Sequence, residues 1–583
     1  MGVNLLVFGW LDYTIFGVLL SVSLLIGIYF GLFSKQDSTS EYLFGGKTMH
    51  YIPVAASILS SFLSGITYLG VPTEVYLHGS QYIITVFSSL AIGAVAAYLI
   101  LPVFYNLRLS SCYEYLELRF SKNVRNFTSI LYIAQLLWYI PVVIYVPALA
   151  FSQVTGYNLH VITPILSIVC IIYTSMGGVK AVVWTDTIQF IFTIGGLTTV
   201  LILGVISIHG FSEIWRIADE GGRIKIFDMD PNPFKRDSFW IIIVGTTFGF
   251  LTRFAFGQKF VQRYLAIEKE SEMKKAIFLT TIGWGILQTA CIFLGLIMYA
   301  HYHGCDPLKA KIIKESDQTL PYYVMDVSGH LFGLPGIFIA GLVSSALSTM
   351  SASLNTLSGL IYSTFVDKWI PENHKKDSTA ANVMKVLSII IGAITIGLIF
   401  IIERLGTVFE MAMSLFSAVE GVILGLFLSG LFIPGIGKRG AIFGGCFSFL
   451  SMTWFVSMTR WYILNGRIRY SNLPTSTEIC PYPLNETELS NMTISSSISV
   501  EDEPFIIFHI SLYYYTFIGG IITIAIGLIT SYFSGEMNTS RVNPDHFSPI
   551  IRRLLPQDKI YVGVPIEVIK KKSDIRIKTR QFN

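Results

Sequence analysis

Across 583 residues, 52% of the side chains are hydrophobic and only 13% are charged, about half the charged share of an ordinary soluble domain. The formal net charge is +4, and no basic stripe of the kind that binds nucleic acid is present. The six cysteines form no CxxC pair, so the sequence signals neither a zinc site nor a redox motif. This composition excludes a soluble multidomain protein and indicates an all-α, polytopic integral membrane protein.

The apolar residues gather into runs of about twenty, the length at which a helix crosses the hydrocarbon core of a bilayer. The first run lacks a preceding basic region and a following cleavage site, so we expect a retained helix and not a signal peptide. The sequence predicts about thirteen transmembrane helices, near 11–33, 51–74, 81–106, 126–150, 157–175, 179–207, 238–256, 276–300, 334–365, 382–402, 407–434, 440–462 and 506–534.

Lys and Arg are concentrated after the third span, after the seventh span and in the tail 535–583, whereas the first ten residues have none. Cytoplasmic loops carry an excess of these residues. We therefore expect an extracellular N-terminus and a cytoplasmic C-terminal tail, in a multi-pass protein of the plasma membrane.

The long polar loop 463–505 is expected on the extracellular side and contains two glycosylation sequons, at Asn485 and Asn491. Cys480 lies in this loop, and Cys305 lies in another loop expected on the same side. An external disulfide and two unpaired thiols are both compatible with the sequence.

Two spans differ from the plain Leu/Ile/Val/Phe runs of the others. The second span contains four serines, a glycine and a threonine between residues 55 and 68, and the ninth is still richer in hydroxyls between 343 and 356. Small hydroxyl residues can simply let helices pack closely. Clustered hydroxyls, together with carbonyls freed by a helix break, are also the oxygen ligands that a dehydrated cation needs inside a bilayer.

Charged side chains within the spans are candidates for function, because an ionised group in the membrane is energetically unfavourable. Asp186 lies in the sixth span, where the alternative is a structural pair with a neighbouring helix. Glu420 lies in the eleventh span, with no partner evident from the sequence. Arg253 lies near the cytoplasmic end of the seventh span, where we expect it to extend to the interface.

The spans also divide into two five-helix halves, 51–207 and 238–434, between a first helix in 1–33 and two peripheral helices in 440–534. Each half would open with a glycine-interrupted helix, at Gly65 in the first and at Gly245 and Gly249 in the second. Corresponding broken helices indicate a central binding site in transporters built from inverted repeats.

Eight motifs in register resemble the sodium/solute symporter family, in the branch of the sodium-coupled monocarboxylate, multivitamin and iodide transporters. They are YLFGGKTM at 42–49, LGVPTEVY at 69–76, CYEYLELRF at 112–120, YVPAL at 145–149, GGVKAVVWTD at 177–186, VQRYLA at 261–266, DQTLP at 317–321 and LST at 347–349. The resemblance implies a leucine-transporter-type core of five plus five inverted helices, one extra N-terminal helix, and alternating access driven by sodium.

The same resemblance implies site residues. The sodium site would use the backbone carbonyls of Ser60, Leu63 and Ser345 and the hydroxyls of Ser348 and Thr349, with Asp186 in support and Gln189 beside it. Thr67, which stands where the iodide symporter has glutamine, and Tyr139 would face the solute. The sequence departs from the family pattern at three places, namely Pro141, Gly257 and Glu420-Gly421-Val422.

We therefore expect a sodium-coupled symporter that imports a small, monocarboxylate-like organic anion. The alternatives are a sodium-coupled carrier of vitamins, iodide or another solute, and a non-transporting solute sensor of the same fold. No nucleophile elbow or zinc-protease helix is present, so we do not expect an enzyme. The expected partners are sodium as the co-transported ion, the solute and the lipid bilayer, without a cofactor or nucleic acid.

The predicted topology can be tested by glycosylation and antibody access. Glycosidase should shift the wild-type protein on a gel but not the Asn485→Gln/Asn491→Gln double variant, because both acceptors lie in the loop expected outside. A C-terminal epitope should be detected only in permeabilised cells. Detection of that epitope on intact cells would contradict the thirteen-span topology.

Overall fold

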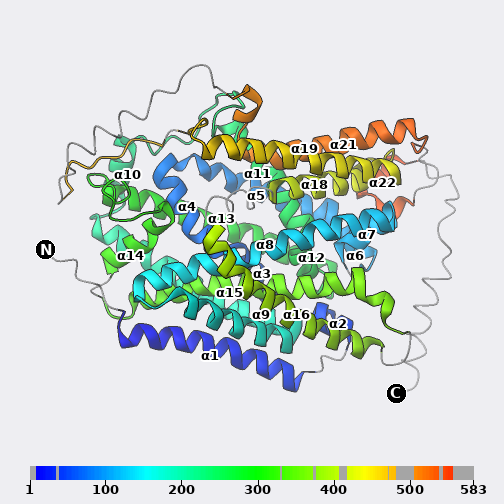
Figure 1. The fold of residues 1–583 in the computed structure, drawn as a ribbon, viewed down its shortest axis with the longest axis horizontal. Helices are drawn as coiled ribbons and strands as arrows, with labels where there is room; N and C mark the ends of the chain where they lie inside the picture. Colours follow the sequence, from blue (N-terminus) through cyan, green and yellow to red (C-terminus); the bar gives the residue numbers. More distant parts are fainter. Residues whose placement is uncertain are drawn as a thin grey trace.

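The computed structural model describes residues 8–34, 38–109, 111–328, 331–371, 376–405, 416–470, 472–480, 504–537 and 543–555, with the side chains of 402–405 excluded. Its long helices run roughly parallel or antiparallel in one bundle (Figure 1). Within the described part of the chain there is no β-strand, and only Met49 and Ile267 form an isolated bridge. The sequons at Asn485 and Asn491 lie outside the described residues.

The first half of the bundle contains the predicted spans with adjusted ends. Its helices are α1 (Trp10–Phe33), α2 (Thr39–Phe44), α3 (Tyr51–Phe62), α4 (Gly65–His78), α5 (Ile84–Val95), α6 (Leu101–Asn106), α7 (Cys112–Arg119), α8 (Lys122–Thr155), α9 (Leu159–Ser207) and α10 (Phe211–Glu220).

The second half and the peripheral helices follow the same pattern. They are α11 (Phe239–Leu251), the π-helical turn η4 (Thr252–Phe256), α12 (Gln258–Tyr264), α13 (Glu270–Tyr302), α14 (Thr319–Ser328), α15 (Leu334–Ile361), α16 (Lys376–Leu405), α18 (Phe416–Phe432), α19 (Lys438–Leu464), α21 (Tyr515–Phe533) and α22 (Pro549–Leu554).

The second predicted span is broken, as expected, immediately before Gly65. Helix α3 ends at Phe62, and Leu63 leaves the helical region with φ −78° and ψ +68°. Ser64 then caps α4, its hydroxyl accepting a hydrogen bond from the backbone N–H of Thr67, the usual role of serine at a helix start. The two helices meet at a bend of 59°.

The expected break in the seventh span is at a different residue. Gly245 and Gly249 both lie inside the continuous helix α11. The chain instead leaves the helix at Gly257, which has φ −70° and ψ +111°, between η4 and α12. The two breaks face each other, because Phe62 stacks on Phe254 at 4.2 Å and on Phe260 at 4.5 Å.

Helix α9 contains two predicted spans and reverses direction at Gly178. A straight helix of 49 residues would be about 74 Å long, more than twice the thickness of a hydrocarbon core. Gly178 has φ +54° and ψ −152°, a conformation essentially restricted to glycine. Residues on both sides of it contact α1, since Tyr173 packs on Gly27 and the amide of Gln189 donates to Ser23.

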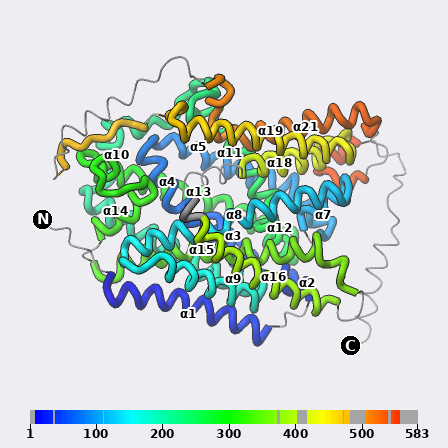
Figure 2. The backbone as a smooth tube through the Cα atoms, in the orientation of Figure 1, coloured from blue at the N-terminus to red at the C-terminus, as the bar shows by residue number. Residues whose placement is uncertain are grey.

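Helix α15 lies at the centre, where its most apolar stretch is 94% buried, against 22% for α1 at the periphery. On the opposite side from α1, the helices α18, α19 and α21 form a separate layer (Figure 2). The contact between α18 and α21 is unusually close: a Cβ added to Gly421 would lie 2.9 Å from Cα of Gly519. Glycine at this contact therefore allows the two backbones to touch.

Ten described helices are long and apolar enough to cross a membrane, or eleven when the bent pair α3 and α4 is counted as one span. This finding takes α9 as a single helix and α18, with 17 residues, as too short. The number of thirteen stays a prediction.

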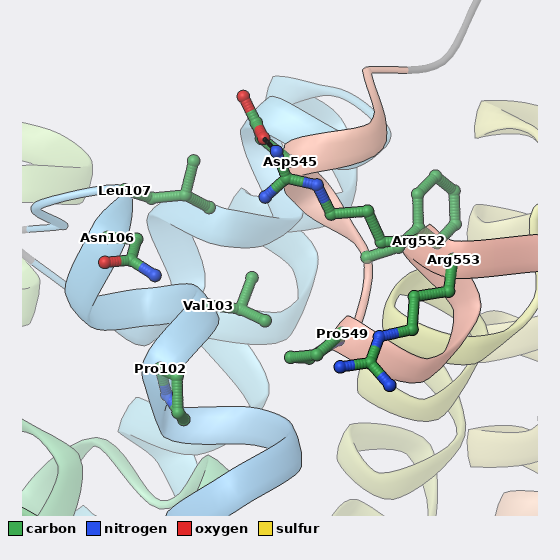
Figure 3. A pocket seen from close by; sticks show the side chains of 9 residues that line it. Pro102, Val103, Asn106, Leu107, Asp545, Pro549, Arg552 and Arg553 are labelled. Atoms are coloured by element: carbon green, nitrogen blue, oxygen red, sulfur yellow. Dashed lines mark ion pairs between the residues drawn. The ribbon is translucent and has the colours of Figure 1, made fainter. Parts of the chain in front are cut away.

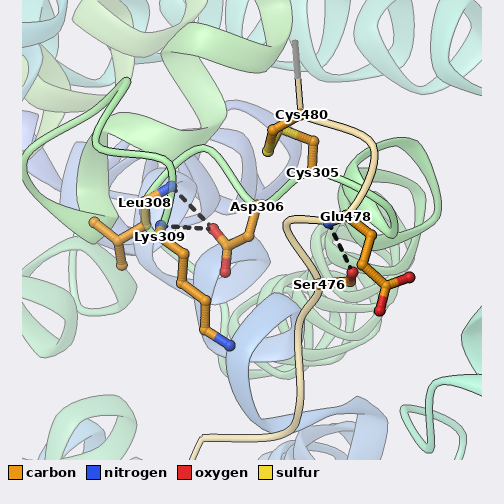
Figure 4. The surroundings of a disulfide bond; sticks show 7 residues. All are labelled: Cys305, Asp306, Leu308, Lys309, Ser476, Glu478 and Cys480. Atoms are coloured by element: carbon orange, nitrogen blue, oxygen red, sulfur yellow. Dashed lines mark hydrogen bonds between the residues drawn. A yellow bond between two sulfur atoms is a disulfide. The ribbon is translucent and has the colours of Figure 1, made fainter. Parts of the chain in front are cut away.

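One end of the bundle is tied together by loops that the sequence places on one side of the membrane. Cys305 and Cys480 form a disulfide, which settles the alternative left open by the sequence (Figure 4). Beside it, Asp306 accepts hydrogen bonds from the N–H groups of Leu308 and Lys309. The disulfide thus joins the loop after α13 to the loop after α19.

The reversal at Gly178 predicts a specific sensitivity. Gly178→Val should lower the free energy of unfolding by about 1–3 kcal/mol, because valine is strained in this backbone conformation. Thermal unfolding of the purified protein in detergent measures the effect. Gly17→Ala is the control, since Gly17 lies in α1 with open space around it. Equal unfolding temperatures for Gly178→Val and the wild type would contradict the assigned turn.

Candidate functional site

Asp186 is fully buried in the second half of α9, and three serines from two other helices surround it. Its carboxylate accepts hydrogen bonds from Ser57 at 2.9 Å and Ser61 at 3.3 Å, both on α3. It also accepts one from Ser351 on α15 at 3.2 Å. The two hydroxyl-rich spans therefore meet at the intramembrane carboxylate, as hydrogen-bonding side chains and not only as small packing residues.

The carboxylate also has a charged partner, Arg263 on α12. The Nη2 of Arg263 lies 3.1 Å from the Oδ2 of Asp186, and both side chains are essentially buried. The Nη1 of Arg263 donates to the carbonyl and the hydroxyl of Ser57, each at 2.7 Å. The structural pair considered as the alternative for Asp186 is thus present, together with the serine cluster.

Sequence reasoning missed the role of Arg263, which it treated only as part of a basic cytoplasmic loop. One signal was available. Arg263 stands in the stretch Phe260–Ile267, where every other residue except Gln262 is apolar or aromatic. An arginine in such an apolar stretch is expected to be buried, and a buried arginine needs a partner of opposite charge.

One helical turn from Asp186, oxygen atoms of α15 converge on the end of α3. The hydroxyls of Ser348 and Thr349 both lie within hydrogen-bond distance of the Ser345 carbonyl, at 3.1 and 2.9 Å. The Thr349 hydroxyl is also 3.1 Å from the Ser61 carbonyl. Because α3 ends at Phe62, its last carbonyls lack helical partners, and those carbonyls face the hydroxyls of α15.

The remaining predicted sodium residues occupy less direct positions. Ser60 and Leu63 flank Ser61 at the end of α3, and among the described residues the buried Ser60 hydroxyl has no hydrogen-bond partner. Gln189 is turned toward α1, where its amide donates to Ser23 at 3.2 Å. Five of the seven predicted residues therefore lie on the facing parts of α3 and α15, whereas Gln189 contacts a peripheral helix.

The two predicted solute-facing residues are connected through Ser64. The hydroxyls of Ser64 and Thr67 lie 3.2 Å apart at the start of α4, and the phenol of Tyr139 on α8 is a hydrogen-bonding neighbour of Ser64. The ring of Tyr139 packs edge-on against Phe416, with centroids 6.0 Å apart. The Nζ of Lys259 lies 5.5 Å from the centre of the same ring.

The structure supplies a partner for Glu420, namely Arg253. The side chain of Arg253 is 53% exposed, and its Nε and Nη2 bind the two carboxylate oxygens of Glu420 at 2.9 and 3.2 Å. Glu420 is on α18, 167 residues away in the sequence. This bidentate pair balances the largely buried carboxylate of Glu420 from the surface of the bundle. Extension of Arg253 to the membrane interface stays a prediction.

A cavity of about 490 Å³ lies elsewhere, between α6 and the segment around α22 (Figure 3). Arg552 and Arg553 extend toward it, and Arg552 pairs with Asp545 at 2.7 Å. None of the residues that line the cavity belongs to the predicted sodium or solute positions, so the cavity is separate from the candidate site. The cavity is lined by Pro102, Val103, Asn106, Leu107, Asp545, Phe547, Pro549, Arg552 and Arg553.

The model of the sodium:solute symporter family matches residues 42–447. The chain is 36% identical over 540 residues to the mouse sodium-coupled monocarboxylate transporter 2, covering 92% of this chain and 86% of the relative. The chain belongs to the sodium:solute symporter family. It is also 35% identical to the sodium-coupled monocarboxylate transporter 1 of Xenopus laevis, covering 96% of this chain and 90% of the relative. Identity to the rabbit sodium-dependent multivitamin transporter is 32%, with 94% and 86% covered.

The fold of this family member matches a solved Na⁺-coupled sialic acid symporter, with a TM-score of 0.73, 22% identity, and coverage of 90% of this chain and 98% of that one. The protein is thus a multi-pass membrane transporter with a leucine-transporter-type helical core, and not an enzyme.

The buried pair predicts a large effect when one partner is removed. Arg263→Met should destabilise the protein by about 3–5 kcal/mol, because it leaves the Asp186 carboxylate buried without its counter-charge. Thermal unfolding in detergent and surface biotinylation measure this loss. The double variant Asp186→Asn/Arg263→Met should recover part of it.

The matched control is Arg216→Met, since Arg216 pairs with Glu213 and Glu220 on an exposed helix face. This variant should unfold like the wild type, as exposed pairs contribute little. An Arg263→Met variant as stable as this control would show that the ion pair does not hold the site.

Proposed function

We propose that this chain is a plasma-membrane symporter that couples sodium entry to the import of small organic monocarboxylates. The observation that supports it best is the convergence of hydroxyl and carbonyl oxygens from α3 and α15 beside Asp186, in a chain 36% identical to a sodium-coupled monocarboxylate transporter. Sodium is a hard cation that must replace its water with oxygen atoms inside the bilayer. Neutral oxygens at a helix break supply them at low electrostatic cost.

In this proposal, the carbonyls of Ser60, Leu63 and Ser345 and the hydroxyls of Ser348 and Thr349 bind sodium. Two contacts support the assignment: Thr349 lies within reach of carbonyls on both α3 and α15, and its partner helix ends there. Asp186 acts through its serines, holding Ser57, Ser61 and Ser351 in place.

Thr67 and Tyr139 are proposed to face the solute, one on each side of Ser64. The break in α3–α4 then serves both substrates, because the end of α3 presents carbonyls to sodium and the start of α4 presents hydroxyls and N–H groups to the anion. Sodium binding can drive transport only if it favours the outward-open state over the inward-open one. The shared break between α3 and α4 can link sodium binding to anion binding, since both ligands would bind to this one segment of the chain.

For the topology, we propose an extracellular N-terminus, a cytoplasmic tail 535–583 and a glycosylated external loop 463–505. The repeats would be 51–207 and 238–434, flanked by the helix in 1–33 and by the two helices in 440–534. The disulfide supports this arrangement, because it joins two loops that the charge pattern assigns to the same outer side.

The proposed function is tested by uptake of radiolabelled L-lactate, pyruvate, butyrate, biotin and iodide, in sodium and in choline medium. Monocarboxylates should accumulate only with sodium. Preferential uptake of biotin or iodide would favour the carriers of vitamins or inorganic anions. Absence of sodium-dependent uptake of every solute, with the protein at the surface, would favour the sensor.

The sodium ligands predict a graded mutational series. Ser348→Ala and Thr349→Ala should raise the sodium concentration for half-maximal lactate uptake roughly 5- to 150-fold, because each loses a buried polar interaction of about 1–3 kcal/mol. Thr349→Ser keeps the hydroxyl and should change it little.

Ser353→Ala is the control, since the Ser353 hydroxyl is bonded to the Thr349 carbonyl within its own helix at 2.7 Å. It should reach the surface and keep the wild-type sodium dependence. Wild-type sodium dependence in both Ser348→Ala and Thr349→Ala would place the coupling ion elsewhere.

A further inference from the structure

Lys259, near the start of α12, is a buried cation that the sodium site does not use. Its side chain is only 7% exposed, and its ammonium lies over the rings of Phe260 and Tyr139, 4.7 and 5.5 Å from their centres. Throughout the described ranges, no Asp or Glu oxygen lies within ion-pair distance of its Nζ. A buried ammonium without a counter-charge is unfavourable, so this position favours an anion that comes from outside the chain.

The neighbouring charges are already balanced. Arg263 follows Lys259 by four residues, on the same helix face, and pairs with Asp186. Arg253 makes two bonds with Glu420. These three cations and two carboxylates leave one positive charge in excess, and that charge is the one on Lys259.

The groups near Lys259 suit a carboxylate. Tyr139 connects it to the hydroxyls of Ser64 and Thr67 at the start of α4. Helix α4 has 14 residues, and the N-terminus of such a helix favours negative charge. The ring of Phe416, edge-on to Tyr139 at 6.0 Å, offers apolar contact to the carbon chain of a small acid. Hydrogen-bond donors, a positive charge and an apolar wall thus meet around one phenol.

We propose that Lys259 binds the carboxylate of the transported anion, between Tyr139 and the start of α4. This assignment rests on the proposed function and deepens it, because a single unbalanced ammonium accounts for selection of an acid with one negative charge. A dicarboxylate would bring a second charge that the balanced pairs Arg253–Glu420 and Arg263–Asp186 do not neutralise. An amide or alcohol of the same shape would leave the ammonium unpaired.

The test compares full-length wild type, Lys259→Met and Lys259→Arg in oocytes, with radiolabelled L-lactate as the probe. Lys259→Met should raise the lactate concentration for half-maximal uptake about 10- to 150-fold, the range for losing a hydrogen bond to a charged group. Lys259→Arg keeps the charge and should stay closer to wild type. Lys275→Met is the matched control, since Lys275 also lies over a tyrosine ring, that of Tyr51 at 5.7 Å, but is exposed.

A second readout separates the anion from sodium. Sodium-dependent charge movement recorded without lactate should keep its sodium half-saturation within about 2-fold in Lys259→Met, because Lys259 is not one of the proposed sodium ligands and the anion is absent. Surface biotinylation should find Lys259→Met at wild-type levels or above, because the variant removes a buried charge that has no partner in the free protein.

The outcomes are distinguishable. Wild type without sodium-dependent lactate uptake would overturn the proposed function, and this assignment with it. Wild-type uptake together with an unchanged lactate half-saturation in Lys259→Met would overturn the role of Lys259 alone. Failure of Lys259→Met to reach the surface, when Lys259→Arg does reach it, would also overturn the assignment, because it would mean that the charge is already satisfied within the folded chain.

Discussion

The Asp186–Arg263 pair is the interaction around which the central helices are arranged. Each of these charges would be very unfavourable alone at this depth, and together they remain favourable only if their other hydrogen bonds are made. Ser57, Ser61 and Ser351 make those bonds from α3 and α15. The pair therefore fixes the positions of four elements, α3, α9, α12 and α15, and it does so through short polar side chains that leave the oxygen atoms one turn away available to an ion.

Much of the fold could be predicted from the sequence, because bilayer thickness sets the length of an apolar run. The two hydroxyl-rich helices could also be found, since such a density of serine has little purpose in a lipid-facing helix. The ion-pair partners of the charged residues could not be predicted. Glu420 and Arg253 are 167 residues apart, and no periodicity relates them, so the sequence could not show that they pair.

The breaks in the two halves illustrate the same limit. The first break lies where Gly65 predicted it, and the Ser64 cap directly before Gly65 is a local feature of the chain. In the second half, Gly245 and Gly249 stay helical while Gly257 does not. Glycine is common in membrane helices, and whether its backbone stays helical depends on the residues that pack against it. Here Gln258 is held by the backbone N–H of Cys112 and the hydroxyl of Ser111, contacts that only the folded chain defines.

The three cations of residues 253–263 come from one short segment that crosses the second break. Two of them are joined to carboxylates on different helices, Arg263 to α9 and Arg253 to α18. The segment is thus held at both ends by ion pairs, with Lys259 between them. Movement of α12 relative to either helix must stretch or exchange a pair, which links the geometry at the anion position to the relative placement of the inner helices and the outer layer.

The backbone contact between Gly421 and Gly519 connects that outer layer to the Glu420–Arg253 pair. Gly421 directly follows Glu420, so the depth at which α21 packs on α18 sets where the carboxylate meets Arg253. An alanine at Gly421 would bring its Cβ to 2.9 Å from a backbone atom of α21, which cannot rotate away as a flexible side chain can. The two helices would therefore have to separate, and the position of the Glu420 carboxylate opposite Arg253 would change with them.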